Sequence, residues 1–205
     1  MFTRLIFIII IIALLFGVTL VYRNLNYKKD IDKKIEKSNI VEKSVALPMG
    51  SIINYGEGKN NGHPLLLIHG QGGDWKVYSD SFLKLSKKYH IYAIDCYGHG
   101  KSSHNPENYN IVDNGDDIIW FIENVIKRET IISGHSSGGL LAIYVASKNN
   151  PLVSGVMLED PPIFSTLKDY APKTWAYLDS FKTINDYLTG SKDEPYDVYY
   201  LKNAL

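Results

Sequence analysis

The pattern of apolar and polar positions begins with an N-terminal run that carries no charge. Residues 5–22 read LIFIIIIIALLFGVTLVY, eighteen residues in all. A helix of this length, at about 1.5 Å per residue, just crosses a hydrocarbon core of about 30 Å. The run is long for the apolar part of a cleaved signal peptide, and no A-x-A site follows it. We therefore expect an uncleaved, single-pass membrane anchor rather than a buried helix of a soluble protein.

The charges that flank this run leave its orientation open. Arg4 precedes the run, and five basic residues follow it: Arg23, Lys28, Lys29, Lys33 and Lys34. The positive charge after the run favours a cytoplasmic location for the rest of the chain. Signal anchors at this place often export the domain on their C-terminal side, so the side of the membrane stays undetermined.

Residues 23–43 are rich in charge and poor in apolar positions. They carry seven basic and four acidic side chains. This composition predicts a solvated linker or a frayed helix between the membrane and a folded domain. A basic patch that touches anionic lipid is a secondary alternative.

From Val45 onward, short apolar runs alternate with segments of helical spacing. Residues 45–56 are typical of a hairpin that turns near Pro48 and Gly50. Further strands are predicted at residues 63–70, 90–95, 130–134 and 153–160. Helical spacing joins Tyr78 to Tyr89, Ile118 to Val125 and Leu140 to Ala146. The alternation predicts an α/β fold, with a mostly parallel, doubly wound sheet over residues 44–162.

Residues 134–139, GHSSGG, stand between a predicted strand and a buried helix. Sites in such sheets lie at the carboxyl ends of the strands. A serine on a sharp turn there projects its hydroxyl above the sheet, and Gly134 and Gly138 leave room because a Cβ would strike a neighbouring element. The N–H groups of the following helix stabilise an anion at the same place. We therefore predict that Ser136 is a nucleophile, rather than part of a capping turn.

Residues 69–75, HGQGGDW, form a glycine-rich loop after the first long strand. A tetrahedral intermediate carries a negatively charged oxygen, which needs two preorganised donors. We predict that the backbone N–H groups of Gln71 and Ser137 are these donors. Three more residues of the loop are expected to contribute to binding: Gly70, Gly72 and Trp75.

Two other interpretations of this loop are weaker. A dinucleotide loop of the form G-x-G-x-x-G would need a glycine where Trp75 stands. His69 is expected to brace the loop by hydrogen bonds rather than to act as a base.

Residues 95–104, DCYGHGKSSH, contain G-K-S but do not form a phosphate-binding loop. A Walker A motif would need a glycine where Asp95 stands. We expect a rigid turn that packs beside the site. His99 and His104 have no carboxylate or cysteine partners at metal-ligand spacing, so no metal is predicted, and no motif requires a cofactor.

The overall composition narrows the classes of function. Lys and Arg number 22, as do Asp and Glu, and the formal net charge is zero. This balance argues against a nucleic-acid-binding protein. The single cysteine, Cys96, excludes an intramolecular disulfide. The expected partners are a small-molecule acyl substrate and the membrane.

The three loops together resemble those of the α/β-hydrolase superfamily. HGQGG is similar to its oxyanion loop, DCYGHGKS to its strand-exit turn D-x-x-G-x-G-x-S, and GHSSGG to its nucleophile elbow. Order and spacing also fit, over about residues 45–162. The resemblance implies a serine hydrolase that cleaves an ester, an amide or a related acyl compound through an acyl-enzyme on Ser136.

The resemblance also implies an acid and a histidine that complete the site. Asp160, in LEDPP, occupies the place that some members use for the acid. Residues 163–205 are rich in aromatic residues and resemble the first part of a helical cap.

The histidines depart from the family pattern, because none of the six follows Ser136. A serine without a base is a weak nucleophile. We therefore expect a truncated chain of a membrane-anchored hydrolase that lacks the catalytic histidine. Two alternatives stay open, a noncatalytic membrane-tethered module that binds small molecules and an inactive remnant of a hydrolase.

Overall fold

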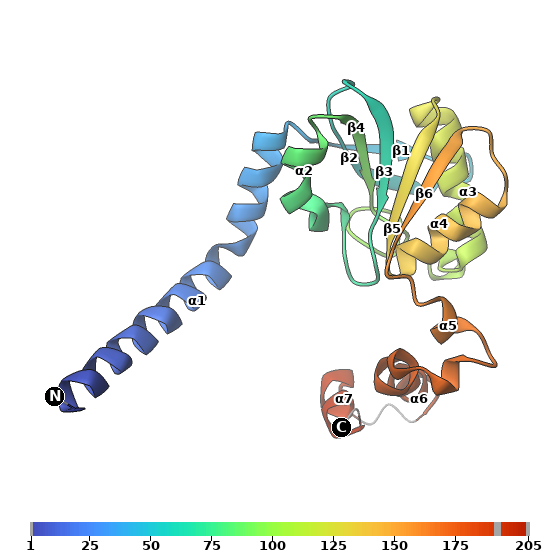
Figure 1. Cartoon of the computed structure of the whole chain (residues 1–205). Coiled ribbons are helices and arrows are strands. Elements are labelled where there is room, and N and C mark those ends of the chain that lie inside the picture. The colour runs from blue at the N-terminus through green and yellow to red at the C-terminus, as the bar shows by residue number, and fades with distance from the viewer. Residues whose placement is uncertain (1, 191–193, 204–205) are drawn as a thin grey trace.

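The computed structural model describes residues 2–190 and 194–203. Figure 1 shows three parts: a long N-terminal helix, a core built around one sheet, and a small group of helices at the C-terminal end. The core carries the candidate site, and the other two parts lie next to it.

The N-terminal helix α1 (Phe2–Ser38) runs without interruption from the apolar segment into the charged one. Of the two alternatives for residues 23–43, a solvated linker or a frayed helix, the structure has a helix as far as Ser38, and strand β1 begins at Val41. The charged segment holds no glycine or proline, and Lys, Arg and Glu are good helix formers. By length and composition, α1 is long and apolar enough to cross a membrane.

The core sheet has six strands in the order β1-β2-β4-β3-β5-β6. They are β1 (Val41–Ala46), β2 (Ile52–Glu57), β3 (His63–Ile68), β4 (Tyr89–Ile94), β5 (Thr130–His135) and β6 (Val153–Glu159). β1 and β2 form the antiparallel hairpin that the sequence predicts, and β2 pairs antiparallel with β4. The pairs β3–β4, β3–β5 and β5–β6 are parallel, which confirms a mostly parallel α/β sheet.

Helices cover both faces of this sheet (Figure 1). A 3-10 turn (Trp75–Tyr78) and α2 (Ser79–Leu85) cover one face. The other face carries α3 (Ile111–Phe121), which continues as a π turn (Ile122–Ile126), and α4 (Ser137–Ser147). Strand β3 shows the reason, because alternate residues enter the two apolar layers: Leu66 and Ile68 on the α3–α4 side, Leu65 and Leu67 on the α2 side.

One helix is shorter than its spacing predicts. Tyr89 shares the helical spacing of Tyr78, Phe82 and Leu85, yet α2 ends at Leu85 and Tyr89 is the first residue of β4. Tyr89 pairs with His63 in the parallel register of β3 and β4. Strand pairing therefore overrides the local periodicity at this position.

The described residues after β6 are largely helical and lie beyond the ends of β5 and β6 (Figure 1). They form α5 (Ile163–Thr166), a 3-10 turn (Ala171–Lys173), a π turn (Tyr177–Phe181), α6 (Lys182–Thr189) and α7 (Tyr196–Asn203). Some aromatic side chains pack on one another, as Tyr187 does on Tyr196 and Tyr199. Others are open to solvent, and Trp175 is 79% exposed.

The register of the central strands brings three loops together. Ile68, the last residue of β3, pairs with Ile94 at the end of β4 and with Gly134 near the end of β5. The loops that follow these strands therefore start side by side at one edge of the sheet. They are the three loops that the sequence marks as functional.

Candidate active site

Ser136 occupies a strained turn between β5 and α4. Its backbone angles are φ 52° and ψ −119°, although it is not a glycine. Its N–H donates to the carbonyl of Glu159 at 2.9 Å, and its own carbonyl accepts from the N–H of Gly139 at 2.9 Å. Backbone strain of this kind is typical of functional residues that the surrounding structure holds in place. The geometry is that of a serine lifted out of the sheet at a strand-to-helix turn.

The glycines around Ser136 are required by close packing of the backbone. A Cβ on Gly134 would lie 2.3 Å from the carbonyl oxygen of Gly138, and a Cβ on Gly138 would lie 2.3 Å from that of Ile68. The prediction that both positions must lack a side chain is confirmed. α4 therefore begins directly against the ends of β3 and β5, with Ser136 at its N-cap.

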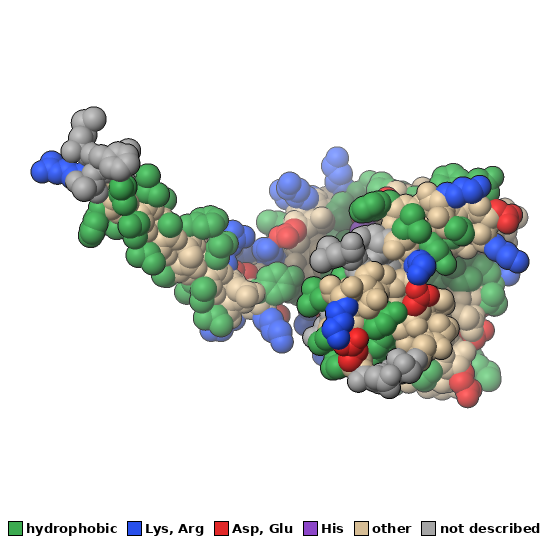
Figure 2. Space-filling view, turned by 90° about the horizontal axis from the view of Figure 1, so that it is seen from below, with side chains coloured by type: hydrophobic (Ala, Val, Ile, Leu, Met, Phe, Trp, Pro, Cys, Tyr) green, Lys and Arg blue, Asp and Glu red, His purple; other side chains and the backbone are tan. Residues whose placement is uncertain are grey.

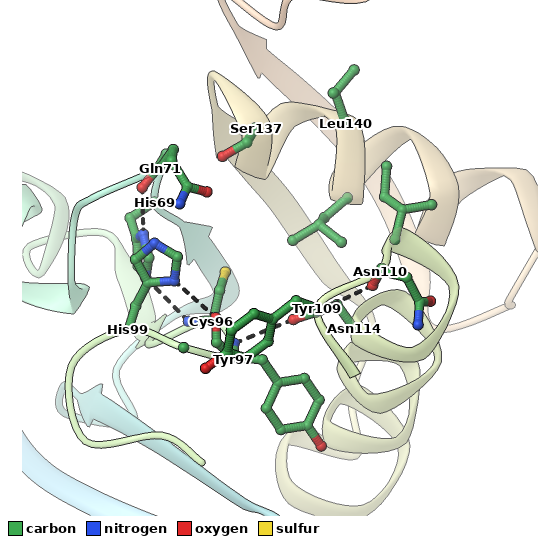
Figure 3. Close-up of a pocket in the computed structure, with 14 residues that line it drawn as sticks. His69, Gln71, Cys96, Tyr97, His99, Tyr109, Asn110, Asn114, Ser137 and Leu140 are labelled. Carbon is green, nitrogen blue, oxygen red and sulfur yellow. Dashed lines mark hydrogen bonds between the residues drawn. The ribbon is translucent and has the colours of Figure 1, made fainter. Parts of the chain in front are cut away.

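The loop after β3 lies against Ser136. A Cβ on Gly70 would lie 2.9 Å from the Cβ of Ser136. The N–H of Gly73 donates to the carbonyl of Gly70 at 3.1 Å, and Gly72 has φ 75°, so the loop turns tightly. Figure 3 shows Gln71 on this loop and Ser137 on the first turn of α4, on opposite sides of a cavity. The two residues predicted to supply oxyanion donors are thus brought together beside Ser136.

His69 braces this loop from within the core, as the sequence predicts. The side chain is 1% exposed, and its Nε2 accepts a hydrogen bond from the backbone N–H of Cys96 at 3.1 Å. The proton must then reside on Nδ1, which donates to the carbonyl of Gly70 at 2.7 Å. Burial lowers the pKa of His69 and keeps the ring neutral. Both ring nitrogens are therefore engaged in holding the loop to the end of β4.

His99 forms a second brace that sequence reasoning missed. Its Nε2 accepts the N–H of Gly72 at 3.0 Å, and its Nδ1 donates to the carbonyl of Tyr97 at 2.8 Å. The His69 and His99 rings pack edge to face with their centroids 5.0 Å apart. Figure 3 shows both side chains beneath Gln71, at one wall of the cavity. The only sequence signal was the position of His99 in the turn after a neighbouring strand.

Asp95 makes the following turn rigid, as expected. The carboxylate is buried, and Oδ1 accepts the backbone N–H of Trp75 at 2.7 Å. Oδ2 accepts the side-chain amide of Asn54 at 2.8 Å and the backbone N–H of Lys101 at 2.9 Å. A Cβ on Gly100 would lie 2.0 Å from Oδ2, so this turn also needs its glycine. The carboxylate ties together the loops after β3 and β4.

Trp75 is not placed for ligand binding, which corrects the prediction from the sequence. Its side chain is 2% exposed and stacks on Phe82 in the α2-side core. The indole N–H donates to Glu42 of β1 at 3.2 Å. The loop reaches its end at Trp75, where the 3-10 turn begins and directs the ring into the core.

Asp160 lies at the end of β6 and is exposed. Its backbone has φ 51°, in the left-handed region. It follows Glu159, whose carbonyl accepts the N–H of Ser136. Asp160 is therefore close in the chain to the elbow, and its role as the acid stays a prediction.

A cavity of about 420 Å³ lies beside the elbow. The loop after β3 and the turn after β4 supply His69, Gly70, Gln71, Cys96 and His99 to its wall, and α4 supplies Ser137 and Leu140. Its far side holds Tyr109, Asn110 and Asn114 (Figure 3). Burial raises the pKa of the Cys96 thiol to about 12, so this thiol stays protonated and is a poor nucleophile. Ser137, the residue after Ser136, is part of the wall, so the cavity borders the start of α4.

Known proteins share this fold and parts of this sequence. Lipase 3 of Moraxella sp. (strain TA144) is 28% identical over 84% of this chain and 54% of its own length. The 2-(acetamidomethylene)succinate hydrolase of Mesorhizobium japonicum is 30% identical over 50% of this chain and 37% of its own length. The crystal structure of a membrane phospholipase A, a bacterial virulence factor, covers 100% of this chain and 71% of its own, with a TM-score of 0.63 and 20% identity.

The chain spans about half the length, or less, of these two curated relatives. The phospholipase structure, at its level of identity, shows the fold alone. The model of the alpha/beta hydrolase family matches residues 65–200, about two thirds of the chain. This match extends from β3 through the elbow into the C-terminal helices. The chain therefore belongs to the alpha/beta hydrolase family.

Proposed function

We propose that this protein is a membrane-anchored serine hydrolase that cleaves an ester, an amide or a related acyl substrate through an acyl-enzyme on Ser136. The observation that carries the proposal is the strained backbone of Ser136, φ 52° and ψ −119°, in contact with the Gly70 loop. A non-glycine residue in this conformation costs about 1–3 kcal/mol and persists only where the surroundings hold it. Family membership gives the reaction class, hydrolysis.

The reaction follows from the positions of the groups. Ser136 Oγ attacks the substrate carbonyl while a base removes its proton, and the carbonyl oxygen becomes negative. The backbone N–H groups of Gln71 and Ser137 hold this oxyanion, supported by the positive end of the α4 dipole. The tetrahedral intermediate collapses, and the leaving alcohol or amine takes the proton from the base. Water then attacks the acyl-enzyme in the same way and releases the carboxylic acid and free Ser136.

The two histidines that line the cavity, His69 and His99, are excluded as the base. His69 and His99 use both ring nitrogens in hydrogen bonds to the loop backbone. We propose that the base is a histidine carried outside these 205 residues, with Asp160 as a candidate for the acid that orients it. The greater length of the curated relatives supports this assignment.

The anchor is proposed to be the apolar part of α1, residues 5–22. The helix is long and apolar enough to cross a bilayer, and its apolar window makes no contact with the core. Buried helices of soluble proteins cover such surface with other elements, and this one does not. A cleaved signal sequence is the alternative, and the N-terminal residue of the mature protein distinguishes the two.

The test uses the whole protein as its gene encodes it, in membranes, with a fluorophosphonate probe and a short-chain ester. Ser136→Ala is expected to abolish both labelling and turnover. Ser137→Ala is the matched control, since it keeps the backbone N–H and loses only a hydroxyl. Retained turnover in Ser136→Ala would overturn the proposal. Ligand binding with no turnover in the unmodified protein would favour a noncatalytic binding module instead.

A further inference from the structure

A second hollow extends from the candidate site to α1. Its volume is about 820 Å³. One wall comes from α1, with Tyr27, Lys28, Ile31 and Asp32, and the other comes from the loop and 3-10 turn after β3. Three residues line both this hollow and the cavity beside Ser136: Gln71, Gly98 and His99. The two spaces therefore adjoin at the oxyanion loop.

The α1 wall is fixed to the core. Ile35 packs against the apolar cluster that contains Trp75 and Phe82. Ser38 is buried at the end of the helix, and the chain enters β1 three residues later. Lys34 and Asp80 of α2 form an exposed ion pair at 2.6 Å, which adds little energy but agrees with this docking. The position of the apolar segment relative to the site is therefore set by one continuous helix.

The length of α1 between its apolar run and the hollow gives the height of the hollow above a bilayer that the run would span. The apolar run ends at Tyr22, and the residues of the hollow, Tyr27 to Asp32, follow five to ten positions later. At about 1.5 Å per residue, this places them about 8–15 Å beyond the hydrocarbon core. The polar layer of each leaflet is about 5–8 Å thick. With residues 5–22 spanning the bilayer upright, as proposed above, the hollow would open at the outer boundary of the lipid headgroups.

The wall of the hollow has the chemistry of a passage for an amphipathic molecule. Tyr27, Ile31 and Val77 offer apolar surface. Charges of both signs stand among them, from Lys28 and Lys76 and from Asp32 and Asp74. Figure 2, which views the molecule from below, shows basic side chains around the junction between helix and core. Apolar surface suits an acyl chain, and charges of both signs suit a dipolar headgroup.

From this geometry we propose that the hollow between α1 and the Gly72–Val77 segment is the entrance for the substrate, and that the substrate is an acyl-ester lipid of the adjacent leaflet. The inference rests on the proposed function and specifies its substrate class. The lipid moves up along α1, and its ester reaches Ser136 at the oxyanion loop. Hydrolysis breaks the acyl–oxygen bond and consumes one water, with a fatty acid and the deacylated lipid as products.

The first test maps lipid contact without catalysis. The whole protein carrying Ser136→Ala is placed in phosphatidylcholine vesicles with a small fraction of phosphatidylcholine that has a diazirine on its acyl chain. After illumination, mass spectrometry locates the crosslinks. We expect crosslinks in the peptides that contain Tyr27, Ile31 or Val77, in addition to residues 5–22. Crosslinks confined to residues 5–22 would overturn the proposal that the hollow is the entrance for the lipid.

The second test compares two adjacent lysines of α1. Lys28 lines the hollow and Lys29 does not, and both are exposed. Lys28→Trp narrows the entrance, so hydrolysis of vesicle phosphatidylcholine should fall about tenfold while that of a soluble acetyl ester stays within about twofold. Lys29→Trp, the matched control, should leave both rates unchanged.

The outcomes separate the two proposals. If the unmodified protein hydrolyses neither substrate, the proposed function fails, whereas the crosslinking result still decides whether lipid enters the hollow. If the protein hydrolyses the soluble ester and Lys28→Trp affects lipid turnover no more than Lys29→Trp does, the entrance is wrong and the hydrolase stands.

Discussion

The segments that follow β3 and β4 differ from the one that follows β6 in how firmly they are held, although all three border the same edge of the sheet. After β3 and β4, the side chains of His69, His99 and Asp95 bind backbone groups of the loops. After β6, Asp160 is exposed, and within the described residues its carboxylate has no hydrogen-bond partner. The half of the site that is proposed to bind the oxyanion is thus held in place by the described residues, and the half that is proposed to hold the acid is not.

This difference agrees with the chemistry proposed for each half. Oxyanion donors act through fixed dipoles, and they lose their advantage if they must reorganise during the reaction. The N–H of Gln71 belongs to a loop that His69 and His99 hold at Gly70 and Gly72. Substitutions that remove one brace at a time can show whether this bracing exists and how much it contributes.

The largest effect is expected from removing the Asp95 carboxylate. Asp95→Ala leaves the N–H groups of Trp75 and Lys101 and the amide of Asn54 without their acceptor. Buried groups left unpaired cost about 1–3 kcal/mol each, so the free energy of unfolding should fall by about 3 kcal/mol or more. Asp160→Ala, on the β6 side, should change it by less than about 0.5 kcal/mol. Urea unfolding in detergent measures both, and equal losses in the two variants would contradict the contrast.

A smaller effect is expected when His99 is removed. His99→Ala frees the N–H of Gly72 and loosens the loop that carries Gln71. We expect kcat for a soluble ester to fall about tenfold with KM nearly unchanged, because the lost interaction acts on the transition state. His104→Ala is the control, since His104 is exposed beyond the turn. A rise in KM alone would show that His99 contributes to substrate binding and does not position the proposed oxyanion donors.

The strain at Ser136 gives a prediction in the stabilising direction. Glycine adopts φ 52° and ψ −119° without the steric penalty of a side chain. Ser136→Gly should therefore abolish turnover and raise the free energy of unfolding by about 1 kcal/mol. Ser136→Ala also abolishes turnover but keeps the strain, so it should not be stabilised. If both variants unfold at the same urea concentration, the elbow stores no strain that glycine relieves.

Much of this half of the site is predictable from sequence because its causes are local. Gly134 and Gly138 are needed because Ser136 lies on a tight turn between a strand and a helix. Backbone carbonyl oxygens lie where a Cβ atom on either glycine would be. The brace at His99 was not predictable, since it joins positions 27 residues apart across neighbouring strands. Trp75 was misjudged for the same reason: its place in the core depends on Phe82 and Glu42.

The fold shows the same division between local and distant causes. Apolar runs and turn residues predicted the strands of the sheet, and the runs in β3 and β4 agree with their burial. β6 was also expected to be a buried strand, but it lies at the edge of the sheet and is largely exposed. The continuation of α1 to Ser38 was not evident from its charge, because the docking of Ile35 on a distant cluster stabilises that end. The hollow beside the site exists only through this docking, so no local pattern could predict it.

The smallest expected effect concerns pH and tests the neutral state of the His69 brace. Burial lowers the pKa of His69 below its ordinary value of 6.5, so the unfolded chain binds a proton more readily than the folded protein does. The stability from the neutral ring is therefore fully present above pH 6.5 and is lost as pH falls through the folded pKa. Unfolding measured by urea at pH 7.5 and pH 5.5 should show a loss of about 1 kcal/mol at the lower pH. His69→Gln keeps a donor and an acceptor but does not titrate, so this variant should lose less stability between the two pH values. An equal loss in both proteins would show that other groups cause the pH dependence and that His69 does not change its protonation state between pH 7.5 and pH 5.5.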